Sequence, residues 1–342
     1  MHVINDENCG WIKDLTKRIS KKKIEKDIEC DLLIVGAGYT GLSAARKLSE
    51  IDPLKKIVIV DAQLAGEGAS SRNSGFLVNS TLNDGLKSNK NLEDYKKKKD
   101  IFELGTNAVK NFIKKYQVNC DLNLTGKYYA SSILNHHKIV MNFSKVLNKV
   151  GVEHNLLFEK KLQDKLGTSF YKVALYTEKD FMLHPAKLVR AMIDILPKNV
   201  YLYENSSLIE WTEHKDAVFC RFSKGNIKTN KIIFCTNGFL KSLGIKKSYN
   251  FPITLTASIT KPLTDAQFDS IGRPKEFGIL PIKPMGATFR LTKDRRILIR
   301  NTAELYKPYK NDKSFLKKRS INQQIGIYKR FPNLPKNLID ST

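Results

Sequence analysis

The sequence lacks the long apolar runs and paired cysteines that define several common classes of protein. No stretch approaches ~18 consecutive apolar residues, and the first residues carry charges rather than a secretory apolar core, so no membrane span is predicted. His136 and His137 have no glutamate at HExxH spacing, so no metal site is predicted. The cysteines form no CxxC pair, which argues against a zinc knuckle or a disulfide framework. Reduced thiols and a cytoplasmic location are therefore predicted.

Acidic residues are also few relative to basic ones. The chain has 59 Lys and Arg against 34 Asp and Glu, which gives a net charge of +25 at pH 7. Such a charge suits nucleic acid or an acidic membrane surface as a partner. The lysines are spread along the chain without interleaved aromatic residues, however, and no DNA- or RNA-binding signature is present. We interpret the charge as solvated lysine-rich surface and predict no specific nucleic-acid partner.

One motif that is present lies at residues 31–48, DLLIVGAGYTGLSAARKL. Its short apolar run, ended by a glycine, is typical of a buried parallel strand. Gly36 allows a tight turn, Gly38 lets a pyrophosphate approach the backbone, and Gly41 lets the following helix pack closely on the strand. The first N–H groups of that helix then face the phosphates. The motif thus predicts a dinucleotide-binding turn.

The residues that follow agree with this prediction. A second apolar strand is predicted at 57–60, and Asp61 comes 20 positions after Gly41, where an acid can accept hydrogen bonds from the adenosine ribose. An acid at this point disfavours a 2′-phosphate and therefore NADP. Residues 62–76, AQLAGEGASSRNSGF, form a Gly- and Ser-rich loop suited to lining the rest of a pyrophosphate and a ring system. The alternatives are a doubly wound sheet without a nucleotide and an ordinary surface loop.

Several motifs resemble those of the D-amino-acid oxidase-like FAD-dependent oxidoreductases. They are the GAGYTGLSAA turn, the acid after the second strand and the GASSRNSGF loop. Segments 184–211, 231–239, 251–263 and 286–301 resemble, in the same order, the family's later helix and strands. The likeness runs from about residue 30 to 330 and is greatest to the amine-oxidising branch that includes gamma-glutamylputrescine oxidase-like proteins.

The resemblance implies an α/β chain, α+β overall, with two discontinuous domains. A Rossmann-like FAD-binding domain is expected at 30–90 and 184–250, and a substrate domain on a mainly antiparallel sheet at 91–183 and 251–310. Residues 1–29 are predicted as a polar lead-in and residues 311–342 as a helical segment. Family members usually continue with a Gly-rich segment that returns to the FAD domain, and no comparable stretch follows here. A fragment, a second polypeptide that supplies this part, and a degenerate protein are the alternatives.

The resemblance also implies FAD as the cofactor and places its contacts on the turn, the loop and two later segments. The predicted cofactor-binding residues are Gly36, Gly38, Tyr39, Thr40, Gly41, Asp61, Ala62, Ser70, Ser71, Arg72, Asn73, Ser74, Gly75, Leu208, Thr236, Asn237 and Gly238. Arg72 is also the candidate catalytic residue, because a cation there can stabilise reduced anionic flavin or a substrate carboxylate. Its alternative role is structural, as a donor to loop carbonyls. Arg290, on a predicted strand, is expected to face solvent.

Together these features imply an enzyme that oxidises a C–N bond of a small amine or amino acid. A hydride would pass from the carbon bearing the neutral amine to flavin N5, and the imine would then hydrolyse. The alternative is a noncatalytic or truncated FAD-binding fragment that needs a second polypeptide. An NAD-dependent dehydrogenase is disfavoured by the Gly/Ser-rich loop after Asp61 and by the late return to the FAD domain.

Overall fold

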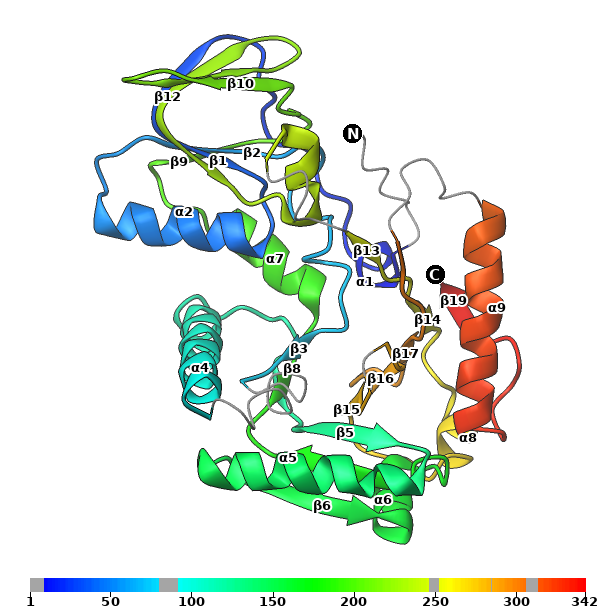
Figure 1. Cartoon of the computed structure of the whole chain (residues 1–342). Helices are drawn as coiled ribbons and strands as arrows, with labels where there is room; N and C mark the ends of the chain where they lie inside the picture. The colour runs from blue at the N-terminus through cyan, green and yellow to red at the C-terminus, as the bar shows by residue number, and fades with distance from the viewer. Residues whose placement is uncertain (1–8, 80–91, 246–251, 284, 306–312) are drawn as a thin grey trace. The chain divides into compact units, whose positions relative to one another are not determined.

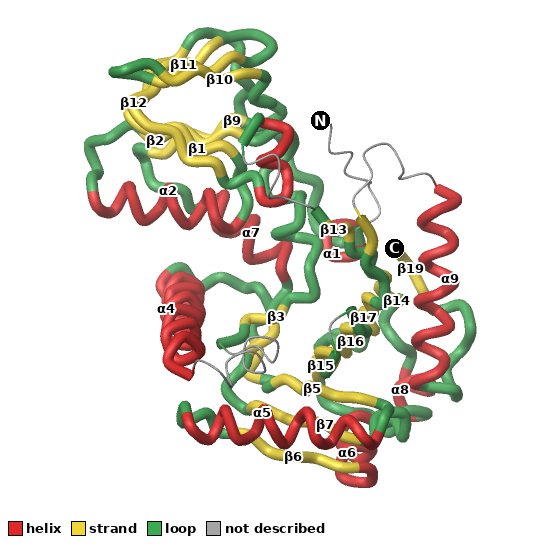
Figure 2. Tube along the Cα trace, viewed as in Figure 1, coloured by secondary structure: helices red, strands yellow, loops and turns green. Residues whose placement is uncertain are grey.

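The computed structural model describes residues 9–79, 92–245, 252–283, 285–305 and 313–342, and the chain divides into two compact units. Unit 1 contains Trp11–Asn73 and Pro185–Pro252, and unit 2 consists mainly of Ser74–His184 and Ile253–Thr342. Figure 1 labels their helices and strands, and Figure 2 colours them by class. Within the described ranges, no helix is both long enough and apolar enough to cross a membrane.

A six-stranded sheet forms the centre of unit 1, in the order β10-β11-β12-β1-β2-β9 (Figure 2). Its strands are β1 (Ile28–Val35), β2 (Ile57–Val60), β9 (Val200–Tyr203), β10 (Glu210–Glu213), β11 (Val218–Arg221) and β12 (Asn226–Phe234). Strands β12, β1, β2 and β9 run parallel, and β10 and β11 extend the sheet in antiparallel pairing. All four residues of β2 are buried, as expected for an apolar strand covered on both faces.

The two longest helices described in unit 1 are α2 (Tyr39–Ile51) and α7 (Pro185–Asp194). Helix α2 begins three residues after β1 and packs against β1, β2 and β9, and α7 packs beside α2 (Figure 1). Alternate side chains of β1 and β2 point to opposite faces, so Leu33 and Val58 lie in the apolar cluster away from α2. A 3-10 helix, η3 (Asn237–Leu243), follows β12. The predicted order of strand, turn, helix and strand over residues 31–60 is confirmed, with β1 starting earlier, at Ile28.

An eight-stranded sheet dominates unit 2, in the order β19-β14-β17-β16-β15-β5-β7-β6. The strands are β5 (Lys127–Ser131), β6 (His154–Phe158), β7 (Val173–Thr177), β14 (Ser258–Thr260), β15 (Phe277–Pro281), β16 (Thr288–Leu291), β17 (Ile297–Arg300) and β19 (Ile339–Ser341). Strand β15 pairs in parallel with β5, and the other pairings are antiparallel. The predicted mainly antiparallel second sheet is thus confirmed.

Successive residues of these strands point to opposite faces of the sheet, and both faces carry apolar side chains. Helices cover the sheet for this reason. The helices of unit 2 are α4 (Leu92–Lys115), α5 (His137–Lys149), α6 (Glu159–Leu166), α8 (Asp265–Asp269) and α9 (Lys313–Arg330), with the 3-10 helix η2 (Leu134–His136). One apolar cluster joins Tyr128 and Phe289 to residues of α6 and α9. The other joins Tyr129 to Phe143 of α5. Both faces of the central strands are therefore buried.

Short elements complete the described chain. They are α1 (Gly10–Lys13), the three-stranded sheet of β3 (Phe76–Leu77), β8 (Phe181–Met182) and β4 (Asn123–Leu124), and the pair of β13 (Ile253–Thr254) and β18 (Glu304–Leu305). Helix α9 (Lys313–Arg330) lies within the segment 311–342 that was predicted as helical. The same predicted segment also contains β19 at Ile339–Ser341, which forms the edge of the sheet by pairing with β14.

Candidate cofactor site

The turn between β1 and α2 requires glycine at two positions on steric grounds. Gly36 has φ +106°, and a Cβ there would lie 2.5 Å from the carbonyl oxygen of Cys235. A Cβ at Gly41 would lie only 1.9 Å from the carbonyl oxygen of Gly36. The predicted turn and the close packing of α2 on β1 therefore both depend on the missing side chains.

Asp61 lies at the end of β2 and points its carboxylate at this turn. Its Oδ2 accepts a hydrogen bond from the N–H of Ala37 at 2.8 Å, and its Oδ1 accepts one from the N–H of Gln63 at 3.0 Å. Burial raises the pKa of Asp61, these N–H groups and that of Ala62 oppose the rise, and the nearby Glu204 carboxylate adds to it. The structure thus brings the acid and the glycine turn together, as the sequence predicted.

The N-terminus of α2 carries no capping side chain on its N-cap residue and no negative charge in its first turn. Gly38 is the N-cap, and the first turn begins with Tyr39 and Thr40. The Ser70 hydroxyl oxygen accepts a hydrogen bond from the N–H of Tyr39 at 2.9 Å, and a Cβ at Gly38 would lie 2.8 Å from that oxygen. Ser70 therefore occupies a position where an oxygen interacts with the first N–H groups of the helix.

The loop after Asp61 folds back on itself and on α7. A Cβ at Gly66 would lie 2.1 Å from Cγ1 of Val189 in α7, and the Ser71 hydroxyl donates to the carbonyl of Gly66. Nε of Arg72 donates to the carbonyl of Glu67 at 2.7 Å. This contact is the one that the structural role predicts for Arg72, and its catalytic role stays a prediction.

Other predicted residues in and after the loop take different places. Nδ2 of Asn73 donates to the carbonyl of Ser70 at 2.8 Å within the loop. Ser74 and Gly75 belong to unit 2, where the carbonyl of Gly75 accepts from the N–H of Leu183 at 2.9 Å. The Leu208 side chain lies in the apolar cluster of unit 1, so any contact of this residue with a cofactor would come from its backbone.

The segment after β12 reaches the glycine turn from the other side. The N–H of Cys235 donates to the carbonyl of Val35 at 2.8 Å, and the N atom of Thr236 would lie 3.4 Å from a Cβ at Gly36. Among the described residues, no group hydrogen-bonds the buried Oγ1 of Thr236. Asn237 is exposed with φ +50°, and Gly238 follows it. Thr236 thus places a buried, unsatisfied hydroxyl beside the turn, as expected where a ligand completes the site.

Arg290 is not the solvent-facing strand charge that was expected. Its side chain is 2% exposed, and Nη2 forms an ion pair with Oε1 of Glu276 at 2.9 Å. Nη1 donates to the carbonyls of Ser74 at 2.9 Å and Leu183 at 2.8 Å. The expectation fails because the neighbouring strands are covered on this face too: a Cβ at Gly278 would lie 1.8 Å from the methyl of Met182.

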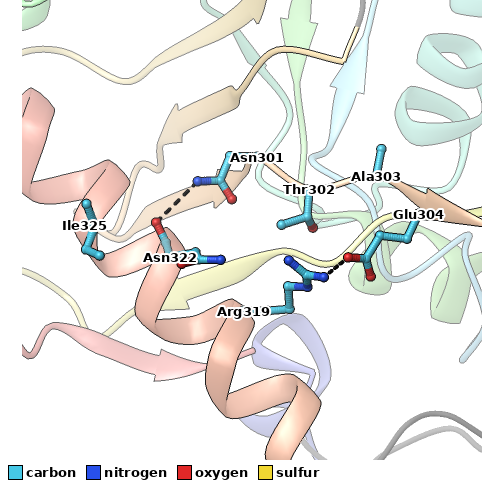
Figure 3. Close-up of a pocket in the computed structure, with 7 residues that line it drawn as sticks. All are labelled: Asn301, Thr302, Ala303, Glu304, Arg319, Asn322 and Ile325. Atoms are coloured by element: carbon cyan, nitrogen blue, oxygen red, sulfur yellow. Dashed lines mark hydrogen bonds and ion pairs between the residues drawn. The ribbon is translucent and has the colours of Figure 1, made fainter.

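Unit 2 also carries a pocket of about 440 Å³ between α9 and the segment that joins β17 to β18 (Figure 3). In Figure 3, Nδ2 of Asn301 donates to the carbonyl of Asn322 at 3.4 Å, and Arg319 forms an ion pair with Glu304. The wall is completed by Thr302, Ala303 and Ile325. None of the predicted cofactor-binding residues lines this pocket.

The fold and the site of unit 1 together define a class of protein. A parallel sheet whose first strand leads through a glycine turn into a helix, with an acid at the end of the second strand, is the dinucleotide-binding fold. A family model described as FAD dependent oxidoreductase matches residues 31–340. The chain belongs to this family, and FAD is its cofactor. The glycine turn, the acid and the unsatisfied Thr236 hydroxyl fit that group.

Two relatives are similar to the chain in sequence. The chain is 26% identical to the probable oxidoreductase OrdL of Haemophilus influenzae over 70% of this chain and 58% of that protein. It is 25% identical to gamma-glutamylputrescine oxidoreductase of Escherichia coli over 80% of this chain and 65% of that protein. The chain therefore spans less than two thirds of the length of each of these two relatives.

Two solved structures share the fold at low sequence identity. Glycine oxidase from Bacillus cereus superposes with a TM-score of 0.65 at 16% identity, covering 91% of this chain and 81% of that chain. L-alpha-glycerophosphate oxidase from Mycoplasma pneumoniae, with FAD bound, superposes with a TM-score of 0.67 at 15% identity and the same coverage. At this identity the likeness establishes the fold.

Proposed function

We propose that unit 1 binds FAD at the turn between β1 and α2, and that the protein uses it to oxidise the C–N bond of a small amine or amino acid. The observation that carries the proposal is the Asp61 carboxylate hydrogen-bonded under a turn in which Gly36 and Gly41 leave no room for a side chain. A protein that uses this fold only as a scaffold has no need of a largely buried acid there, because removing its charge from water is costly.

Each group of the site has a role in this proposal. Asp61 accepts hydrogen bonds from the adenosine ribose hydroxyls, as acids at this position do in dinucleotide-binding folds. The first N–H groups of α2 donate to the pyrophosphate. The Ser70 hydroxyl, which accepts from the N–H of Tyr39 in the structure, then donates to the pyrophosphate as well. The unsatisfied Oγ1 of Thr236 gains a hydrogen-bond partner on the cofactor.

The chemistry follows from the cofactor, and the chain's residues orient it. FAD, when bound, supplies a hydride acceptor at flavin N5. The substrate loses a hydride from the carbon that carries its neutral amine, and water hydrolyses the resulting imine. Arg72 is the candidate to balance negative charge at the reacting centre, provided that it leaves its contact with the carbonyl of Glu67.

The names of similar proteins support an amine or amino acid as the substrate. The relative from Escherichia coli is named for gamma-glutamylputrescine, and the fold is shared with a glycine oxidase. Because the chain spans only part of the curated relatives, this substrate class is a proposal for the chain and not a transfer from them.

The first test is a visible absorption spectrum of the full chain after incubation with FAD and desalting. We expect flavin bands to remain with the wild-type protein and to be lost in Asp61→Ala, which removes the acceptor of the ribose hydroxyls. Glu213→Ala serves as the control, because it removes an exposed acid of the same unit. Wild-type protein that retains no flavin would contradict the proposal. Retained flavin leads to a screen of amines and amino acids, in which bleaching of the bands identifies substrates.

A further inference from the structure

Arg18 and Glu204 form a buried ion pair in unit 1, outside the residues predicted to contact FAD. Arg18 belongs to the polar segment ahead of β1, and Glu204 directly follows β9. Nη2 of Arg18 lies 2.9 Å from Oε1 of Glu204, and the two side chains are 10% and 0% exposed. Because the desolvation of a buried pair offsets much of its attraction, stability alone is a weak explanation for it.

Both members of the pair bind the backbone of one loop residue, Ala65. Oε1 of Glu204 accepts a hydrogen bond from the N–H of Ala65 at 2.8 Å, and Nη1 of Arg18 donates to its carbonyl at 2.8 Å. The other carboxylate oxygen of Glu204 accepts from the N–H of Lys21 at 2.5 Å. The N-terminal segment, the end of β9 and the loop after Asp61 therefore meet at this one carboxylate.

Ala65 lies between two residues that the proposed FAD site uses. Asp61 precedes it by four positions and Ser70 follows it by five. Next to it, Gly66 has φ +74° and packs so closely on α7 that a Cβ would clash with Val189. The loop can therefore take up a displacement of Ala65 only by moving the segment that leads to Asp61 or the one that leads to Ser70.

We propose that Arg18 is a positioning residue of the FAD site. Through Ala65 and Glu204 it holds the loop from Asp61 to Ser70 in the conformation that accepts the cofactor. The proposal rests on the proposed function, because the role of this loop in FAD binding is part of that function. It adds that the N-terminal segment, which carries none of the dinucleotide-binding motif, determines how tightly the motif binds.

The test compares two arginine variants of the full chain, Arg18→Met and Arg221→Met. Arg221 is the matched control, because its ion pair with Glu210 also measures 2.9 Å and lies in the same unit, but the two side chains are 54% and 62% exposed. We expect Arg18→Met to raise the dissociation constant for FAD, measured by quenching of flavin fluorescence, about tenfold or more, which corresponds to about 1.4 kcal/mol of lost binding free energy. Arg221→Met is expected to leave it unchanged.

A second measurement separates positioning from simple stabilisation. The rise in melting temperature caused by FAD depends on the ratio of its concentration to the dissociation constant. In Arg18→Met this rise is expected to shrink, whatever happens to the melting temperature without FAD. A lower melting temperature without FAD, combined with an unchanged dissociation constant, would show a structural role only and overturn the proposal.

Arg18→Lys keeps the test decisive if the methionine variant does not fold. A lysine retains the charge beside Glu204 but cannot donate to Glu204 and to the Ala65 carbonyl from one rigid plane. We therefore expect folded protein with weakened FAD binding, and wild-type affinity in this variant would overturn the proposal. A wild-type chain that takes up no FAD is a separate result, since it contradicts the proposed function itself.

Discussion

At the scale of a single residue, the carboxylate of Asp61 lowers the folding stability of the FAD-free chain, although it belongs to the proposed FAD site. Its carboxylate is largely buried, and burial raises its pKa although the backbone N–H groups of Ala37, Gln63 and Ala62 stabilise the charge. A carboxyl whose pKa is higher in the folded than in the unfolded chain favours folding most at low pH. Its contribution is lost as the pH rises through the folded value. At neutral pH the ionised form therefore costs stability that FAD binding can recover.

This gives a pH-dependent prediction for Asp61→Asn. Without FAD, the melting temperature of the wild type relative to the variant is expected to fall as the pH rises above 3.8, the ordinary value for this carboxyl, through its raised pKa. The variant should lose FAD binding throughout, because an amide has one acceptor oxygen in place of two. Melting curves of both proteins over this pH range provide the measurement. A wild-type melting temperature that instead rises with pH relative to that of the variant would mean that the surroundings of Asp61 lower its pKa.

At the scale of elements, the same substitution is expected to act with opposite sign in two helices. Gly41→Ala places a Cβ 1.9 Å from the carbonyl oxygen of Gly36, so α2 must move away from β1. Gly105→Ala lies in α4, where an added Cβ meets nothing within 4 Å. There, alanine is expected to stabilise the helix by about 0.5–1 kcal/mol through its higher helix propensity.

Denaturant unfolding and FAD titration check this pair of variants. Gly41→Ala should lower the free energy of unfolding by about 1–3 kcal/mol, because an over-packed site forces the backbone to shift. It should also lose FAD binding, whereas Gly105→Ala keeps it. Equal effects of the two variants on stability would contradict the close approach of α2 to β1.

The elements that the sequence predicted well are those whose signal is local. Strand β2 is specified by a run of apolar residues, and the turn after β1 is specified by glycines within a few positions. Arg290, Arg18 and strand β19 could not be predicted in this way. Their partners lie far along the chain: Ser74 is 216 residues from Arg290, and Glu204 is 186 residues from Arg18. A polar side chain whose partners are this distant looks the same, in sequence, as one that faces solvent.

At the scale of the whole molecule, the chain passes from unit 1 to unit 2 after Asn73 and returns after His184. Arg290 donates to the carbonyls of Ser74 and Leu183, which lie at these two passages, and Glu276 neutralises its charge. One buried guanidinium thus joins the beginning and the end of the first long segment of unit 2. Its removal is therefore expected to affect the whole unit rather than one strand.

Arg290→Met is predicted to destabilise unit 2 by about 3–5 kcal/mol, because it leaves the buried Glu276 carboxylate without its counter-charge and two carbonyls without their donor. The control is Lys179→Met, which removes an exposed ion pair with Glu153 in the same unit and should cost about 1 kcal/mol or less. The double variant Arg290→Met/Glu276→Gln should recover part of the loss, since it removes the uncompensated charge as well. Urea unfolding followed by circular dichroism measures all three.

The contrary outcome is an Arg290→Met variant that loses no more stability than the control. That result would show that contacts other than those of Arg290 fix the segments at Ser74 and Leu183, and that the buried pair does not stabilise unit 2.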